Sequence, residues 1–127
     1  WYYLFYSGNA FAIDAYAVGV ARSKNIWGPY EKSPRPLLRD DENFSGPGHQ
    51  FLIQDQDGRW RMFYHARLKG IEAPYRYLMH DLVTFGDDGW PRVNNGFPGP
   101  MKPGAVKAAE RIHKNYLTRI RRQTSSD

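Results

Sequence analysis

WYYLFYSG, residues 1–8, returns in altered form as RWRMFYHA, residues 59–66, and the period from Leu4 to Met62 is 58 residues. Both copies are rich in aromatic side chains, which favour β-strands. In each copy a second strand-like segment and a Trp-containing turn follow at similar distances, at 16–22 and 27–30 after the first copy and at 75–83 and 89–92 after the second. The chain is therefore built from a repeat, whose period is somewhat longer than the about 40–50 residues of a four-stranded propeller blade.

The composition predicts a packed globular domain rather than a disordered chain. The 127 residues are 41% hydrophobic and 16% aromatic, which is enough apolar surface for a core. The absence of cysteine excludes a disulfide framework and a thiolate metal site. No apolar run approaches the about 20 residues that a membrane span requires. These features leave the cellular compartment open.

The net positive charge comes entirely from the end of the chain. Residues 102–127 hold seven Lys or Arg against two acidic residues, whereas residues 1–101 hold eleven of each. A neutral body lacks the basic footprint of a nucleic-acid-binding surface. We therefore expect neither a nucleic acid nor a membrane as a partner.

The second copy predicts one complete four-stranded meander. Its strands are expected at 51–53, 60–66, 75–85 and 90–93, with a hairpin turn at Asp57-Gly58 and a tight connector at 45–49, SGPGH, before the first strand. The first copy holds only the last three strands, and Pro34 and Pro36 suit its outer edge because proline cannot donate to a sheet. We predict an all-β fold of about one and three-quarter propeller blades.

Two blades cannot close a ring, so we expect residues 1–96 to be the last two blades of a larger propeller. Proline and glycine predict a linker at 97–104. Apolar residues at three- and four-residue spacing then predict a basic amphipathic helix over 105–122, with a frayed tail up to residue 127. The role of the tail stays open between a host-specific extension, the start of another domain, an out-of-frame translation and an interaction helix. We favour a solvated helix.

Three polar residues are predicted to meet at one end of the blades, because strand directions in a meander alternate. His49 precedes the innermost strand, Arg76 precedes the third strand of the same blade, and Asp14 lies at the equivalent connection of the preceding blade. His49 would then face the central channel, and Arg76 and Asp14 would face a ligand. Each residue also has a structural interpretation: His49 could organise its loop, Arg76 could pair with Glu72, and Asp14 could serve the turn.

The remaining candidates have weaker functional interpretations. His65 and His80 lie inside predicted strands and are expected to be structural. Asp40, Asp41 and Glu42 are adjacent in one loop, whereas glycoside hydrolysis needs carboxylates held apart on separate elements, about 6.5–9.5 Å in inverting enzymes. We predict no catalytic residue within this chain. No nucleophile triad, phosphate loop or convincing metal cluster is apparent.

An ordered set of motifs gives the chain a family resemblance. It consists of YYLFYS (2–7), YAVGVARS (16–23), GPY (28–30), GPGH (46–49), YHA (64–66), RYL (76–78) and DGWP (88–91). Together these resemble the C-terminal part of glycoside hydrolase family 43, five-bladed propellers that hydrolyse arabinan, xylan side chains and xylo-oligosaccharides. The resemblance covers roughly residues 1–93.

The resemblance implies an inverting glycosidase that acts on arabinose- or xylose-containing carbohydrates. Its Asp base, Glu acid and second Asp would lie upstream of this chain, so the fragment alone would be inactive. It also implies that His49 faces an axial site for water or a metal ion, with Ca²⁺ or another cation as the cofactor, and that Arg76 contacts substrate. The family usually has Gly before this Arg, whereas this chain has Tyr75. The alternative function is a non-catalytic carbohydrate-binding or scaffold propeller.

Overall fold

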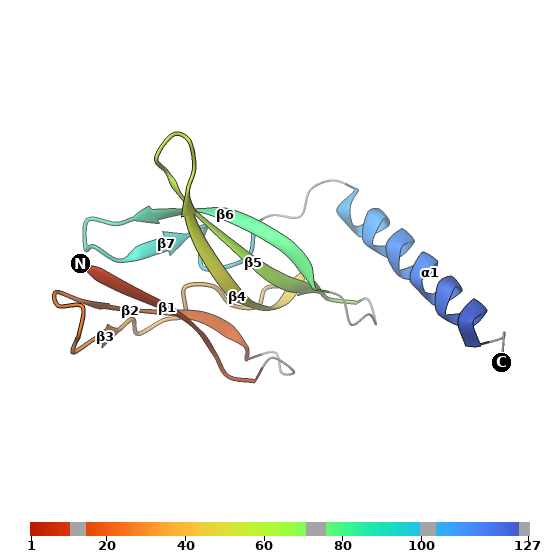
Figure 1. Ribbon diagram of the computed structural model, residues 1–127, viewed down its shortest axis with the longest axis horizontal. Helices are drawn as coiled ribbons and strands as arrows, with labels where there is room; N and C mark the ends of the chain where they lie inside the picture. Colours follow the sequence, from red (N-terminus) through yellow and green to blue (C-terminus); the bar gives the residue numbers. More distant parts are fainter. Residues whose placement is uncertain (11–14, 71–75, 100–103, 125–127) are drawn as a thin grey trace. The chain divides into compact units, whose positions relative to one another are not determined.

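The computed structural model describes residues 1–10, 15–70, 76–99 and 104–124, and these contain seven β-strands and one α-helix (Figure 1). The chain divides into two compact units. All strands belong to the first unit and the helix belongs to the second.

The first sheet is an antiparallel meander of β1 (Tyr2–Gly8), β2 (Ala17–Ser23) and β3 (Glu31–Lys32), in that order. β1 and β2 pair along their whole length, from Tyr2 opposite Ser23 to Gly8 opposite Ala17. Tyr6 lies opposite Gly19, and its ring occupies the space that a side chain at position 19 would need. Gly19 therefore leaves room for the Tyr6 ring to lie across the second strand.

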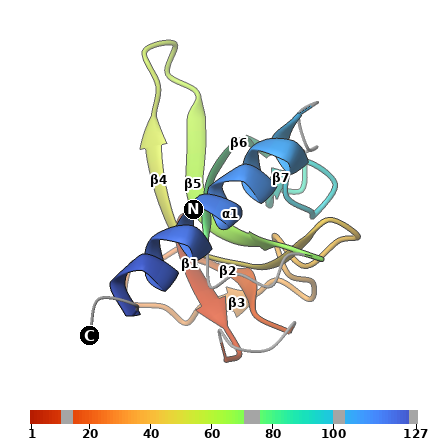
Figure 2. The same cartoon turned by 90° about the vertical axis from the view of Figure 1, so that its right-hand side faces the viewer.

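The second sheet is a four-stranded antiparallel meander, in the order β4 (Phe44–Gln54), β5 (Trp60–Leu68), β6 (Tyr77–Phe85) and β7 (Pro91–Val93). β5, β6 and β7 correspond to β1, β2 and β3, as the sequence repeat predicts. The hairpin between β4 and β5 turns at Gly58 and projects beyond the other strands (Figure 2). The first sheet contacts the second through β1 and β2 against β4.

The predicted connector at 45–49 is wrong, because these residues belong to β4. Their pairing with β5 is irregular, with register shifts between Ser45 and Gly48 and again between Gly48 and Phe51. Gly46 and His49 adopt positive φ angles of 59° and 54°. The strand therefore bends through the Gly-Pro-Gly segment instead of ending there, as bulged strands do.

The outer edge of the first sheet accommodates its prolines as expected. The amide of Ser33 donates to the Val20 carbonyl at 2.9 Å, and the amide of Leu37 donates to the Val18 carbonyl at 2.7 Å. Pro34 and Pro36 fall between these two bonds, where no donor is needed.

Both sheets contribute to the core. Its largest fully buried side chains include Val18, Leu38, Met62, Tyr64 and Val93, each at most 2% exposed. Burial of one such side chain stabilises the fold by about 1.5–3 kcal/mol. The Tyr64 hydroxyl donates to Oδ2 of Asp81 at 2.6 Å, and the same oxygen accepts the amide of Gly99 at 3.2 Å. These bonds hold the segment after β7 against β5 and β6.

The helix α1 spans Ala105–Thr124, two residues longer than predicted. Arg121 and Arg122 lie in its last turn, where the helix dipole stabilises positive charge. Its apolar side chains Ile112, Tyr116, Leu117 and Ile120 are between 36% and 50% exposed. Within the described residues no helix is long and apolar enough to cross a membrane. The predicted linker at 97–104 stays a prediction, since residues 100–103 lie outside the described residues.

Candidate functional site

Polar and aromatic side chains from both sheets gather at the end where β1 finishes and β2 and β6 begin. We call them the end cluster: Tyr16, His49, His65, Arg67 and Arg76. The Tyr16 and His65 rings are stacked with centroids 6.1 Å apart, and the His49 ring meets His65 edge-on at 6.0 Å. The end cluster thus joins the entry of β2 to β4 and β5.

His49 is held at its backbone by the first sheet. Its amide donates to Oγ of Ser7 at 3.0 Å, and that hydroxyl donates to Oε1 of Gln50 at 3.0 Å. The positive φ angle of His49 turns the chain locally, and His49 is exposed to solvent. The imidazole is therefore fixed at its base and accessible at its tip.

Gly48 is required by the close approach of Tyr16. A Cβ atom at position 48 would lie 2.2 Å from Cε1 of the Tyr16 ring, which is far inside van der Waals contact. Gly48 is also the residue opposite His65 in the pairing of β4 with β5. The missing side chain lets Tyr16 cross β4 and stack on His65.

His65 is the member of the end cluster that the sequence interpretation treated as structural only. Burial lowers the pKa of its imidazole, and the neighbouring positive charges of Arg76, His49 and Arg67 lower it further. A neutral imidazole can accept a hydrogen bond at one nitrogen and donate from the other. His65 lies beside His49 because it pairs with Gly48, the residue that precedes His49. This register cannot be read from the sequence, because the pairing of β4 with β5 is irregular on both sides of Gly48.

Arg76 directly precedes Tyr77, which pairs with Ala66 of β5, so the structure places Arg76 at the same end of the blade as His65 and His49. Its residue is exposed, and the described residues provide no ion-pair partner for it. Glu72, the partner in its structural interpretation, lies outside the described residues, as does Asp14. The role of Asp14 stays a prediction.

The family model described as glycosyl hydrolases family 43 matches residues 1–91, which include both sheets up to the first residue of β7. The chain belongs to family 43. The resemblance carried by the ordered motifs is thereby confirmed.

Curated relatives extend far beyond this chain. A non-reducing end alpha-L-arabinofuranosidase of Bacteroides ovatus is 36% identical over 83 residues, which are 58% of this chain and 16% of the relative. A xylan 1,3-beta-xylosidase of a Vibrio species is 33% identical over 103 residues, which are 74% of this chain and again 16% of the relative. The chain thus spans less than a fifth of the length of these two relatives.

Solved structures of family 43 confirm the fold class. A family 43 protein from Bacillus licheniformis aligns with a TM-score of 0.67 and 29% identity, over 77% of this chain and 20% of that one. An exo-1,5-alpha-L-arabinanase from a bovine ruminal metagenomic library gives 0.63 and 29%, over 74% and 34%. The two sheets are accordingly propeller blades, one with three strands here and one with four.

Two acidic side chains of the 40–42 loop have structural partners in this family 43 chain. Oδ1 of Asp40 accepts the amide of Gly46 at 2.8 Å, and its other oxygen lies 3.5 Å from Nζ of Lys69. Oδ1 of Asp41 accepts the amides of Asn43 and Phe44 at 2.7 and 2.6 Å. Both carboxylates therefore shape the entry to β4.

The described residues do not by themselves fit a cation site. Among them no three His, Cys, Asp or Glu side chains gather closely enough to hold a metal ion. Ca²⁺ takes six to eight oxygen ligands, whereas the end cluster offers imidazoles, a phenol and guanidinium groups. The axial cation stays a prediction, and no step of the reaction is derived through it.

Proposed function

We propose that the complete protein hydrolyses O-glycosidic bonds of arabinose- or xylose-containing polysaccharides or oligosaccharides. The observation that carries the proposal is the family 43 match over residues 1–91. The names of the relatives add support, since they include an arabinofuranosidase and a xylosidase. The chain spans only 16% of each, so the activity is proposed for the complete protein.

The proposed reaction inverts the anomeric centre with two carboxylates. A carboxylic acid protonates the leaving oxygen while a carboxylate activates water on the opposite face of the sugar. We place these groups upstream of this chain, and the structural partners of Asp40 and Asp41 are consistent with that placement.

The end cluster has a binding role in this proposal. The exposed guanidinium of Arg76 donates to sugar hydroxyls, and Asp14 would accept from them. His49 faces the axial site beneath the sugar and offers one ring nitrogen to water. Stacking of Tyr16 on His65, and the edge-on contact of His65 with His49, restrict where that imidazole can point. A fixed orientation matters because catalysis depends on positioning within fractions of an ångström.

The proposal is tested by expressing the complete open reading frame and assaying it on nitrophenyl arabinofuranoside and nitrophenyl xyloside. We expect activity on at least one substrate, with the product released in the opposite anomeric configuration in an NMR time course. Residues 1–127 alone should be inactive. Retention of configuration would refute the inverting mechanism without refuting glycosidase activity.

Arg76→Ala tests the assignment within this chain. We expect a higher KM and a lower kcat/KM on the same substrates, because a substrate donor is lost. Arg59→Ala is the matched control, since Arg59 is an exposed arginine in the β4–β5 hairpin. Sugar binding without hydrolysis by the complete protein would favour a non-catalytic carbohydrate-binding propeller instead.

A further inference from the structure

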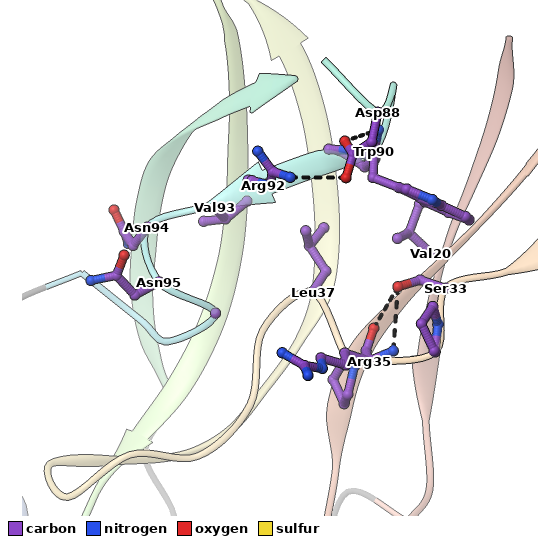
Figure 3. A pocket seen from close by; sticks show the side chains of 14 residues that line it. Val20, Ser33, Arg35, Leu37, Asp88, Trp90, Arg92, Val93, Asn94 and Asn95 are labelled. Atoms are coloured by element: carbon purple, nitrogen blue, oxygen red, sulfur yellow. Dashed lines mark hydrogen bonds and ion pairs between the residues drawn. The ribbon is translucent and has the colours of Figure 1, made fainter. Parts of the chain in front are cut away.

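A groove of about 640 Å³ lies between the outer edges of the two blades (Figure 3). One wall is the proline-containing stretch 33–37, which follows β3. The other wall is 88–96, which contains β7 and the turns on either side of it. Its volume falls within the about 300–1,000 Å³ of typical small-molecule sites.

The floor of the groove is apolar and firmly packed. Val20, Leu37 and Val93 line it and are 2%, 6% and 1% exposed. They belong to the core that joins the two blades, so the shape of the floor is set by the fold itself.

The indole of Trp90 also lines the groove and is held in place. The guanidinium of Arg22 lies over one of its faces, 4.0 Å from the ring centroid, and Arg22 does not line the groove. Trp90 therefore presents its other face or its edge to a ligand. An immobilised aromatic ring loses little conformational entropy on binding.

Polar groups with spare hydrogen-bonding capacity line the same groove. Among the described residues, the guanidinium of Arg35 and the side-chain amide of Asn95 have no hydrogen-bond partner. Arg92 donates to Oδ2 of Asp88 at 2.9 Å, and Oδ1 of Asp88 accepts the backbone amide of Trp90 at 3.1 Å. The carboxylate is therefore engaged, whereas the Arg92 guanidinium keeps further donors for a ligand. Planar donors and acceptors beside an aromatic ring and an apolar floor match a sugar, which has both hydroxyl groups and apolar C–H faces.

We propose that this groove is an accessory binding site for a linear pentose oligosaccharide, a stretch of the polysaccharide outside the active site. The choice of ligand rests on the proposed function. Arg35 and Asn95 donate to hydroxyl oxygens, and the sugar rings lie over Val93 and against Trp90. A site of this kind increases the local concentration of the polymer at the enzyme.

The groove is separate from the end cluster. It follows β3 and β7 at the outer edge of each blade, whereas His49 lies on β4, and β5 and β6 intervene between β4 and β7. Substitutions at Arg35 and Asn95 should therefore leave hydrolysis of a small substrate unchanged.

The test uses the complete protein in native gels cast with soluble linear xylan or arabinan. The variant Arg35→Ala/Asn95→Ala is compared with wild type and with the control Gln56→Ala/Arg59→Ala, which alters two exposed residues of the β4–β5 hairpin. We expect the first variant to bind the polymer about tenfold more weakly, as loss of one or two hydrogen bonds predicts. The control should migrate as wild type does. A second variant, Asn95→Leu, keeps a side chain of similar size, removes its amide donors and should weaken retention likewise.

The readouts separate this proposal from the proposed function. Unchanged retention of both groove variants, or no retention of wild type, would overturn the accessory site whatever the activity. Loss of retention with unchanged kcat/KM on the nitrophenyl glycoside supports it. Loss of retention in a protein that hydrolyses neither glycoside would leave the groove standing as a sugar site and refute the glycosidase proposal.

Discussion

The guanidinium of Arg22, on the second strand of the first blade, lies 4.0 Å from the ring centroid of Trp90, which directly precedes the outermost strand of the second blade. The guanidinium also lies over Trp1, 4.3 Å from its ring centroid. Nη1 of Arg22 also donates to the Asp88 carbonyl at 2.6 Å, and Nε lies 3.3 Å from Glu31. One side chain therefore connects the two blades at the end opposite the end cluster.

Arg22→Met should lower the free energy of unfolding of the complete protein. The side chain is only 12% exposed, and a desolvated cation over aromatic rings contributes about 2 kcal/mol. Lys24→Met is the matched control, because the Lys24 ammonium also lies over Trp1, at 3.8 Å from the ring centroid, but Lys24 is exposed. Its effect should stay below about 1 kcal/mol. Thermal melting of both variants tests this prediction. Equal losses of stability in the two variants would contradict a role for Arg22 in joining the blades.

Tyr64→Phe should destabilise the fold by about 1–3 kcal/mol, because it leaves Asp81 with one buried hydrogen bond fewer. Burial, followed by the bond to Asp81, raises the pKa of Tyr64. The folded state therefore holds this proton more tightly than the unfolded state. Its stabilising contribution is complete below about pH 10 and is lost as the pH rises beyond that value. Denaturant unfolding between pH 8 and pH 11 should show this loss in wild type and a smaller one in Tyr64→Phe.

Gly48→Ala should destabilise the protein by about 1–3 kcal/mol, since the new methyl group overlaps the Tyr16 ring. Removing that ring relieves the overlap, so Gly48→Ala should cost less in a Tyr16→Ala background. Gly8→Ala is the control, because a Cβ atom there meets nothing closer than 4.0 Å. Strictly additive losses for positions 16 and 48 would show that the contact is unimportant.

His65 should make the stability depend on pH in the acidic range. Its pKa is lowered in the folded state, so the folded protein binds this proton less readily than the unfolded chain. Stability is then fully present above about pH 6.5 and falls as the pH drops below that value. His65→Gln should flatten the melting temperature between pH 5 and pH 7, whereas His80→Gln serves as a histidine control. In NMR titrations Arg76→Ala should raise the pKa of His65, and an unchanged value would argue against their proximity.

His49→Ala in the complete protein should lower turnover and lower the melting temperature only slightly, because the residue is exposed and its amide bond to Ser7 remains, whereas the ring contact with His65 is lost and Ala is less suited to the positive φ angle. His49→Asn is the informative companion, since Asn tolerates a positive φ angle and keeps a polar tip. Turnover on nitrophenyl glycosides and bound-ion content by elemental analysis are the two measurements. Wild-type values for both would remove His49 from the site.

The repeat was readable from the sequence because aromatic and β-branched residues alternate with clear turn signals. The strands from Tyr2 to Lys32 and from Trp60 to Val93 lie close to their predicted places. The path of β4 was not readable, since Gly46 and Pro47 signal a turn locally and only pairing with β5 keeps the chain extended. The contacts of Tyr16 with His65 and of Arg22 with Trp90 join segments far apart in sequence. Such contacts depend on how the blades pack, which no local pattern encodes.

The position of Arg22 between two indoles has an optical consequence. Trp1 and Trp90 belong to different blades and share this guanidinium only when the blades are docked. Their emission should therefore change at the docking step, whereas Trp27, which is 90% exposed, should emit in both states as it does in water. Single-tryptophan variants would let stopped-flow fluorescence follow docking separately from the formation of each blade.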